Sequence, residues 1–377
     1  MKFVINRDRL LKSLNDVMKA ISSRAAIPIL TGVKIEADQQ GITLTGSDSN
    51  ISIESFIPIE ENGKVNIQEI VPGQVVLQAS YFPEVIRKLP EKTVEVEVDE
   101  QLNVKIISGN ALFNLNGQDA DEYPQLPQLQ ANNTFNIASN LLKGLINQTV
   151  FAISTMETRP ILTGVNIKFD DQKLSFTATD SHRLALKEIP LDTEIDLPNI
   201  VVPGKSLTEL VKILDDTNDP IEVSVTNNLI LFKTNHLKFL SRLLDGNYPD
   251  TSRLIPSDGK TELRVTTKQL INTIDRASLL AKDERNNVVT LTTKDDQIIE
   301  ITSSSTEVGK VTEELTTESI SGEELKISFS AKYMLEALKA VEADEVIIHF
   351  TGAMRPFVIR PANEDPITQL ITPVRTF

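Results

Sequence analysis

The chain has no cysteine and no tryptophan, and only three of its 377 residues are histidine. The missing thiols exclude a disulfide framework, a thiolate metal site and a cysteine nucleophile. The histidines are solitary, and no His-x-x-x-His or mixed carboxylate spacing suggests a metal site. Aromatic residues make up 5% of the chain, which leaves little for a platform on which nucleic-acid bases could stack. We therefore expect no bound metal and no cofactor.

The chain also lacks the loops G-x-G-x-x-G and G-x-x-x-x-G-K-[ST], which cradle phosphate groups. No apolar run approaches the roughly 18 residues that a membrane-spanning helix needs. The first residues, MKFVINRDRLLKSL, have no apolar core of the kind found in signal peptides. These absences predict a soluble cytoplasmic protein.

Acidic residues outnumber basic ones by 53 to 38, which gives a formal net charge of −15 and a pI near 4.8. This balance argues against nucleic acid, because a duplex carries about one phosphate charge per 1.7 Å of its axis. The cations are unevenly spread, however: segments 7–24, 139–159 and 265–287 hold eleven Lys or Arg against six Asp or Glu. These segments either gather cations for a polyanion or form ordinary solvated helix faces, and charge alone leaves both interpretations open.

Two motifs recur at one spacing. Pro28–Val33 (PILTGV) returns as Pro160–Val165, and Thr45–Asn50 (TGSDSN) returns as Thr177–His182 (TATDSH), in both cases 132 residues later. Two separated motifs at one offset indicate a duplicated domain. In each copy an alternating apolar strand leads through a polar turn into a second strand, which is typical of a β-hairpin.

The repeat extends beyond the hairpin and into a third, more divergent copy. Short strands precede helices with an apolar stripe at 3–5, 135–137 and 263–265. Second helices follow at 79–89, 204–214 and 331–341, and further strands come after them. We expect an α+β protein of three domains, 1–127, 128–256 and 257–377, which short proline-bearing joins hold in rigid contact.

Asp180, Ser181 and His182 have the residue types of a hydrolase triad. Adjacent residues on a strand or tight turn point apart, whereas a triad needs its nucleophile, base and orienting acid to converge within hydrogen-bond reach. The sequence therefore favours a protein without catalytic residues of its own.

The features that carry a family resemblance are the threefold repeat, the MKF start, the segments TDSHRL (179–184) and DGNYPD (245–250) and the Pro-Val-Arg end. In these features the chain resembles the bacterial DNA polymerase III beta subunits over its whole length. These proteins are the replicative sliding clamps. The resemblance implies a DNA clamp with three repeated βαββ-type domains per chain, and a ring-shaped homodimer with inner helices and outer antiparallel sheets. Such a ring encircles duplex DNA and tethers the replicative polymerase, so that it confers processivity without being an enzyme.

The partners that the resemblance implies are duplex DNA of any sequence, a second copy of the chain, the DNA polymerase III catalytic subunit, the clamp loader and other proteins with a clamp-binding motif. No membrane is implied. Arg24 matches a DNA-contacting arginine of the family, and repeat position adds Lys205 and Lys332. The dimer interface would set Leu279 and Leu280 of one chain against Phe113 and Leu115 of the other.

The resemblance also implies a docking pocket for short peptides where the second and third copies meet. Its residues would be Arg159, Leu162, Thr179, Ser181, His182, Arg183, Leu184, Pro249, Arg253, Leu254, Met354, Pro356, Leu370, Thr372, Pro373, Val374 and Arg375. The apolar members can form a cleft and the arginines can ring it for acidic or carbonyl groups. Relatives often carry Met where Thr372 and Val374 stand, and the chain continues to Thr376 and Phe377, so pocket depth and the reach of the tail are open.

A second class of function is compatible with the same pattern. A non-catalytic repeat scaffold that binds only protein partners would also have three copies and no catalytic constellation. Retention on circular DNA distinguishes the two classes, because a scaffold would show none.

Overall fold

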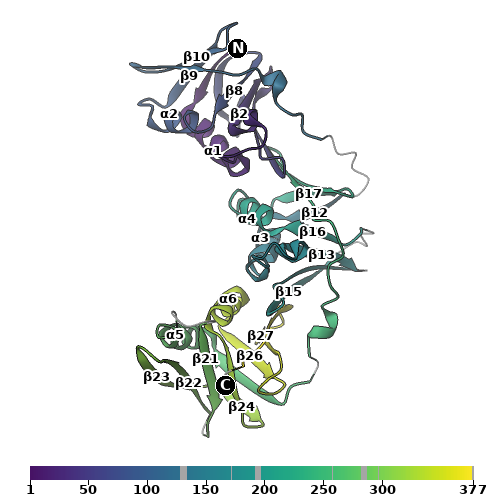
Figure 1. Cartoon of the computed structure of the whole chain (residues 1–377). Coiled ribbons are helices and arrows are strands. Elements are labelled where there is room, and N and C mark those ends of the chain that lie inside the picture. The colour runs from purple at the N-terminus through teal and green to yellow at the C-terminus, as the bar shows by residue number, and fades with distance from the viewer. Residues whose placement is uncertain are drawn as a thin grey trace. The chain divides into compact units, whose positions relative to one another are not determined.

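The computed structural model describes residues 1–127, 134–170, 172–191, 197–256, 258–281, 287–295 and 297–375. The chain divides into two compact units, Met1–Asn140 with Glu209–Leu243 and Leu141–Thr208 with Leu244–Phe377. Each unit has its own sheets (Figure 1). Within the described ranges, no helix is long and apolar enough to cross a membrane.

Each copy repeats one order of elements: a strand, a helix and three strands, and then the same five elements again. The first copy contains β1 (Lys2–Asn6), α1 (Arg7–Val17), β2 (Gly32–Ala37), β3 (Gly41–Ser47), β4 (Ile51–Pro58), β8 (Gly73–Gln78), α2 (Phe82–Lys88), β9 (Thr93–Val98), β10 (Asn103–Ser108) and β11 (Ala111–Asn116). A small hairpin, β5 (Glu60–Glu61) with β6 (Lys64–Val65), and the edge strand β7 (Ile67–Val71) are added to it.

The second and third copies follow the same order, as predicted, and the third adds the short strand β24 between its two halves. The second contains β12 (Thr134–Ala138), α3 (Ser139–Asn147), β13 (Gly164–Asp170), β14 (Lys173–Thr179), β15 (Arg183–Pro190), β16 (Ile200–Pro203), α4 (Gly204–Val211), β17 (Pro220–Val225), β18 (Leu229–Lys233) and β19 (Leu237–Arg242). The third contains β20 (Thr261–Thr266), α5 (Thr267–Ser278), β21 (Val288–Thr293), β22 (Ile298–Ser305), β23 (Gly309–Thr316), β24 (Ser319–Gly322), β25 (Lys326–Ser330), α6 (Ala331–Val341), β26 (Glu345–Phe350), β27 (Phe357–Pro361) and β28 (Ile367–Ile371).

The recurring PILTG motif forms the same local structure twice. Pro28–Thr31 and Pro160–Thr163 are short 3-10 turns, and the threonine hydroxyl donates to the proline carbonyl at 2.8 Å in the first and 2.7 Å in the second. A Cβ on Gly32 would lie 2.5 Å from Val76, and a Cβ on Gly164 would lie 2.7 Å from Val201. The motif recurs because strand packing beside each turn leaves no room for a side chain.

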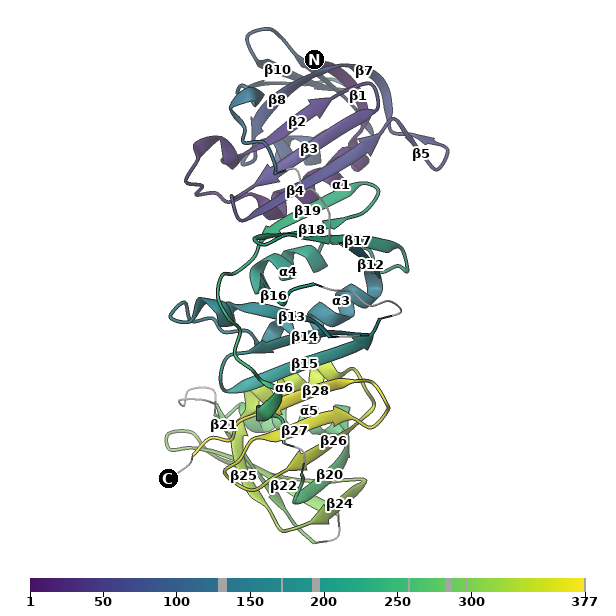
Figure 2. The ribbon, with the colours of Figure 1, turned by 90° about the vertical axis from the view of Figure 1, so that its right-hand side faces the viewer.

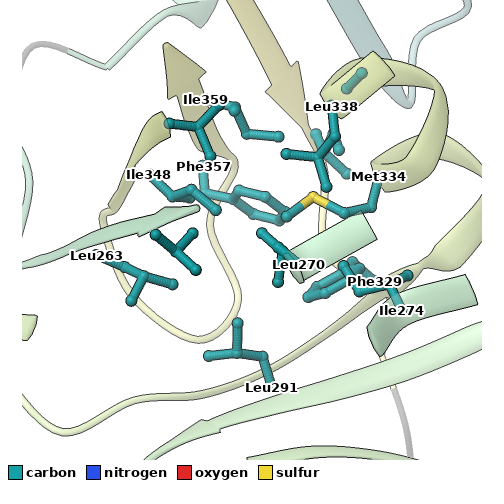
Figure 3. Packing of buried hydrophobic residues seen from close by; sticks show 14 of the residues in the cluster. Leu263, Leu270, Ile274, Leu291, Phe329, Met334, Leu338, Ile348, Phe357 and Ile359 are labelled. Atoms are coloured by element: carbon teal, nitrogen blue, oxygen red, sulfur yellow. The ribbon is translucent and has the colours of Figure 1, made fainter. Parts of the chain in front are cut away.

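The apolar stripes of the helices face the cores, as their spacing predicts. In the third copy Leu270 and Ile274 of α5 and Met334 and Leu338 of α6 are almost fully buried (Figure 3). They pack against side chains from both sheets of that copy, among them Leu291, Phe329, Ile348, Phe357 and Ile359. Burying a side chain of this size stabilises the fold by about 1.5–3 kcal/mol.

In each copy, the first strand of each half pairs with the three-strand meander of the other half. In the first copy β1 joins β9, β10 and β11, whereas β8 joins β2, β3 and β4. The same pairing joins β12 to β17–β19 and β16 to β13–β15, and joins β20 to β26–β28 and β25 to β21–β23. Every described ladder is antiparallel, so the predicted α+β class is confirmed.

The sheets continue from one copy to the next. Strand β4 pairs with β19 in an eight-stranded sheet, and β15 pairs with β28 in a nine-stranded sheet (Figure 2). The second copy therefore shares one sheet with each neighbour, which is why the division into two compact units cuts across it. Strands β11 and β23 each end a sheet, so the outward side of each lacks a strand partner in the described part of the chain.

Candidate functional sites

The turn that connects β14 to β15 holds the residues that suggested a triad. One carboxylate oxygen of Asp180 accepts hydrogen bonds from the backbone N–H groups of His182 and Arg183, at 2.9 and 3.1 Å. The hydroxyl of Thr179 donates to the carbonyl of Arg183 at 2.5 Å, and Ser181 has a φ of 78°. Asp180 therefore stabilises the turn and does not orient the His182 imidazole. The first copy forms the same turn at Asp48, with Ser49 at a φ of 75°.

Arg183 lies at the centre of a buried polar network, and its side chain is 8% exposed. Its Nε donates to Asp180 at 3.0 Å, one terminal nitrogen pairs with Glu336 of α6, and the other donates to the carbonyl of Phe151 at 2.6 Å. The guanidinium also lies over the ring of Tyr333, 4.4 Å from its centroid, and 5.4 Å from that of Phe151. Burial raises the pKa of the Tyr333 hydroxyl, and the nearby Asp180 carboxylate adds to this shift.

An apolar cluster lies beside this network, on the junction between β15 and β28. Leu184 faces Leu370 across the strand pair, and both pack with Val358 of β27. Leu186 and Ile255 are half-buried against them. Leu186, Pro249 and Ile255 also line a groove of about 700 Å³, whose other lining residues are mostly polar.

The end of the chain runs along the same place. The N–H of Thr372 donates to the carbonyl of His182 at 2.9 Å, and the N–H of Val374 donates to the carbonyl of Ser328 at 2.8 Å. Thr372, Pro373 and Val374 are half-buried, and Arg375 is exposed. Residues 376 and 377 lie outside the described part of the chain.

The seventeen predicted pocket residues fall into three classes of burial. Buried members are Leu162, Thr179, Arg183, Leu184 and Leu370, and half-buried members are Pro356, Thr372, Pro373 and Val374. Exposed members are Arg159, Ser181, His182, Pro249, Arg253, Leu254, Met354 and Arg375. Leu254 and Met354 are 53% and 55% exposed, so both apolar side chains are open to contact with a ligand.

Sequence reasoning missed Val358, Leu186, Ile255, Tyr333 and Glu336 at this place. The signal for Leu186 was available, because it is two residues from Leu184 on one strand and therefore on the same face. Tyr333 and Glu336 gave no signal, since only the packing of α6 brings them to β15.

The equivalent junction between β4 and β19 is polar. Repeat position puts Ser52 where Leu184 stands and Glu54 where Leu186 stands. Glu54 forms an ion pair with Lys238 across the strands at 2.8 Å. This charged pair stands where the second junction has an apolar side chain, so the two junctions differ in what they can bind.

The predicted DNA-contacting residues are all exposed. Arg24 lies in the loop between α1 and β2, Lys205 in the first turn of α4 and Lys332 in the first turn of α6. Several other helix cations are already paired with carboxylates, for example Lys12 with Asp215 at 3.9 Å. Among the described residues, Arg24 and Lys332 have no such carboxylate within 4 Å.

Asp16 is an acidic exception among the cations of α1. Burial raises the pKa of its carboxyl to about 6, against the opposing effects of Lys12 and Arg9. A folded pKa above the unfolded value near 3.8 means that the folded state holds the proton more tightly. The contribution of Asp16 to the free energy of unfolding is therefore most favourable below about pH 4, and it is lost as the pH rises through 6.

We predict that Asp16→Asn stabilises the protein above pH 6 by on the order of 1 kcal/mol, after allowance for solvent screening. Thermal melts of both proteins between pH 4 and 8 test this. The gain should vanish toward pH 4, where Asp16 is protonated, and a gain independent of pH would rule out titration of Asp16 as its source.

Two of the four predicted interface residues, Phe113 and Leu279, are exposed. Phe113 is 38% exposed on the edge strand β11, and its neighbour Leu112 is 55% exposed. Leu115 and Leu280 are half-buried, and Leu279, directly after α5, is 57% exposed. Leu112 was not predicted.

The chain is a repeat protein: it has three copies of one α+β fold, and neighbouring copies share sheets. Its exposed surface has cationic and apolar parts, which is typical of a protein that binds other macromolecules. Across the described residues there is no group of three or more His, Asp or Glu side chains that could hold a metal ion.

Three family models match the chain, described as the N-terminal, central and C-terminal domains of the DNA polymerase III beta subunit, over residues 1–127, 136–250 and 252–375. The beta sliding clamp of Bacillus subtilis is 57% identical over the full length of both chains. The crystal structure of the Bacillus subtilis DNA polymerase sliding clamp matches with a TM-score of 0.96 over 100% of both chains. A sliding clamp from Pseudomonas aeruginosa bound to griselimycin, 25% identical, matches with a TM-score of 0.93 over 100% of both chains. The chain belongs to the DNA polymerase III beta subunit family.

Proposed function

We propose that this protein is a replicative sliding clamp: a homodimeric ring that encircles duplex DNA, tethers the DNA polymerase III catalytic subunit and docks other proteins of replication and repair. It is a processivity factor and not an enzyme. The observation that carries this proposal is that the copies share sheets through two kinds of strand. Among the described residues, one strand of each kind has no partner on its outward side: β11 in the first copy and β23 in the third.

The two unpaired edge strands, β11 and β23, are of the two kinds that pair with each other within the chain. Within the chain, each junction pairs the third strand of a copy's first meander with the last strand of the following copy: β4 with β19, and β15 with β28. The remaining strands of these two kinds are β23 and β11. A head-to-tail dimer pairs them twice, which closes the ring and removes both open edges.

Repeat position also gives the register of this pairing. Phe113 is opposite Ile106 as Phe239 is opposite Phe232, and Val311 is opposite Ser303 as Ile53 is opposite Gly46. Because Phe239 faces Ile53 in the chain, Phe113 faces Val311 of the partner subunit.

Exposed cations on the helices and on the loop after α1 supply the DNA contacts of the ring, with Arg24, Lys205 and Lys332 among them. Contacts to phosphates carry no sequence information, so a ring held by them binds every duplex alike and can slide. The acidic remainder of the surface keeps the protein soluble without opposing the contacts inside the ring.

We predict that Arg24→Ala weakens binding to all duplexes alike and lowers the slope of log K against log salt concentration by about 0.9, the value for a single neutralised phosphate. Fluorescence anisotropy with two unrelated duplexes over a range of salt concentrations measures this. Lys64→Ala, which removes an exposed cation of the β5–β6 hairpin, is the matched control and should leave the slope unchanged. An unchanged slope for Arg24→Ala would exclude Arg24 as a phosphate contact.

The apolar cluster of Leu184, Val358 and Leu370 forms the floor of the docking pocket for partner peptides, and the exposed Leu254 and Met354 extend it. The polar first junction, with Ser52 and Glu54, explains why docking is confined to the second one. Methionine suits a site that accepts several ligands. Griselimycin, to which the Pseudomonas aeruginosa clamp is bound, is a second ligand to test on this chain.

Retention on DNA of different topology tests the function. The protein is loaded by its clamp loader on a nicked circular plasmid and separated from free protein by gel filtration. A sliding clamp remains with the circle and is released after one restriction cut, because it slides off the ends. Equal behaviour on circular and linear DNA would favour the protein-only scaffold.

The domain limits 1–127, 128–256 and 257–377 and a cytoplasmic location beside the chromosome belong to the same proposal. Limited proteolysis near the two joins tests the limits, and fluorescence microscopy of a tagged chain tests the location.

A further inference from the structure

Arg183 is the one residue of the predicted pocket whose side chain is enclosed on every side by charged and aromatic groups. Its three nitrogens each donate a hydrogen bond, to Asp180, Glu336 and the carbonyl of Phe151. Its guanidinium lies against the rings of Tyr333 and Phe151. A side chain engaged in this way, and 8% exposed, has no free edge to present to a ligand.

The network joins three elements that are distant in the sequence. Arg183 is the first residue of β15, Tyr333 and Glu336 lie on α6 of the third copy, and Phe151 lies in the 3-10 turn Val150–Ala152 after α3. A planar guanidinium holds the donors of three nitrogen atoms in one fixed plane, whereas an ammonium group has a single nitrogen whose donors rotate. The residue therefore fixes the start of β15 against α6.

The start of β15 is also the wall of the docking cleft. Leu184 follows Arg183 and points to the opposite face of the strand, where it meets Leu370 and Val358. His182 precedes Arg183, and its carbonyl accepts the hydrogen bond from Thr372 that holds the end of the chain. Displacement of Arg183 would move both the cleft floor and the tail.

The first junction provides an internal comparison. The Asp48 turn has the same hydrogen bonds as the Asp180 turn, but Ile51 stands where Arg183 stands. Helices α4 and α6 begin at Gly204 and Ala331, so Ser206 and Glu209 occupy the positions of Tyr333 and Glu336. A network needed only to join copies would be expected at both junctions. The arginine and the tyrosine are present only where the apolar cleft lies.

We propose that Arg183 acts in peptide docking as a positioning residue: held by Glu336, Tyr333 and Phe151, it sets the place of β15 and of the chain end, and it does not itself contact the peptide. This inference rests on the proposed docking function. It makes Glu336, which does not belong to the predicted pocket, a determinant of peptide affinity.

Calorimetry with a short peptide derived from the polymerase catalytic subunit tests the inference on the full-length dimer. Glu336→Gln keeps the shape of the side chain and removes its charge, and it should weaken peptide binding about tenfold if the binding-competent arrangement falls to roughly a tenth of the population. Arg183→Lys should have a similar effect. The two changes together should cost little more than either alone, because they break one unit. Glu209→Gln, at the equivalent position of α4, is the matched control and should bind as the parent does.

Each alternative gives a different result. If Arg183 binds the peptide directly, Glu336→Gln frees its guanidinium and leaves affinity unchanged or higher, which overturns the inference. If the network serves folding alone, the melting temperature of Glu336→Gln falls while peptide affinity stays within twofold of the parent, which also overturns it. A parent chain that binds neither the peptide nor griselimycin would contradict the docking site itself.

Discussion

A chain carrying Leu279→Ala and Leu280→Ala is expected to be a monomer of 41.8 kDa at low micromolar concentration, where the parent chain has about twice that mass. Leu279 is 57% exposed directly after α5, so its side chain is open to contact with a partner subunit. Truncating large apolar side chains in a packed interface costs a few kcal/mol, and the ring has two such interfaces. Sedimentation equilibrium measures the change, and retention on circular DNA should disappear with it.

The matched control is Leu141→Ala, an exposed leucine of α3 that is 41% exposed and lies outside the proposed interface. It should remain dimeric. A dimeric double variant would show that these leucines are not in the interface, and an unfolded one would assign them to the core of the third copy.

The strand register offers an independent check of the same interface. Because the chain has no cysteine, Phe113→Cys with Val311→Cys introduces the only thiols. Paired across the proposed strands, they lie within the distance that a disulfide spans, and oxidation should yield a covalent dimer. Phe113→Cys with Thr312→Cys is the control, since a shift of one residue moves the second thiol to the other face of the sheet. Equal cross-linking of both pairs would refute the register.

Deletion of residues 373–377 is expected to abolish binding of a polymerase-derived peptide while the dimer and its retention on circular DNA remain intact. The deleted segment includes Val374, whose N–H donates to Ser328, and it follows Thr372, which is bonded to His182. Its loss removes one side of the cleft whose floor is Leu184 and Leu370. Calorimetry should show no heat of binding at peptide concentrations that saturate the parent chain.

Removing only residues 376 and 377 is the control, and it should preserve binding because the bonded part of the tail remains. Peptide binding that survives the longer deletion would move the docking site elsewhere. A longer deletion that yields monomers would show instead that the tail supports the third copy.

Periodicity in the sequence was sufficient for the elements and their order. The stripe of Leu270 and Ile274 faces the core because apolar side chains at helical spacing share one face, whatever the surrounding fold. The offset of 132 residues between the PILTGV motifs is a direct property of the chain. The ends of the helices were less accurate: the second helices expected at 79–89 and 204–214 are α2, Phe82–Lys88, and α4, Gly204–Val211. Tertiary packing decides helix ends more than local preference does.

The sequence by itself determined that the protein has three copies of one α+β domain, no cysteine chemistry and cations gathered near its helices. Only the tertiary structure decided which strands join the copies. No pattern in the sequences of β4 and β19 predicts that they pair, because their pairing depends on packing over the whole unit. The tertiary structure also decided the role open to Arg183. In the sequence, Arg183 is a cation of the kind usually found at the surface. In the fold, the carboxylate of Glu336, 153 residues away, neutralises its charge and the Tyr333 ring covers it. A charge can be buried only where such partners converge, and their convergence is a property of three-dimensional packing alone.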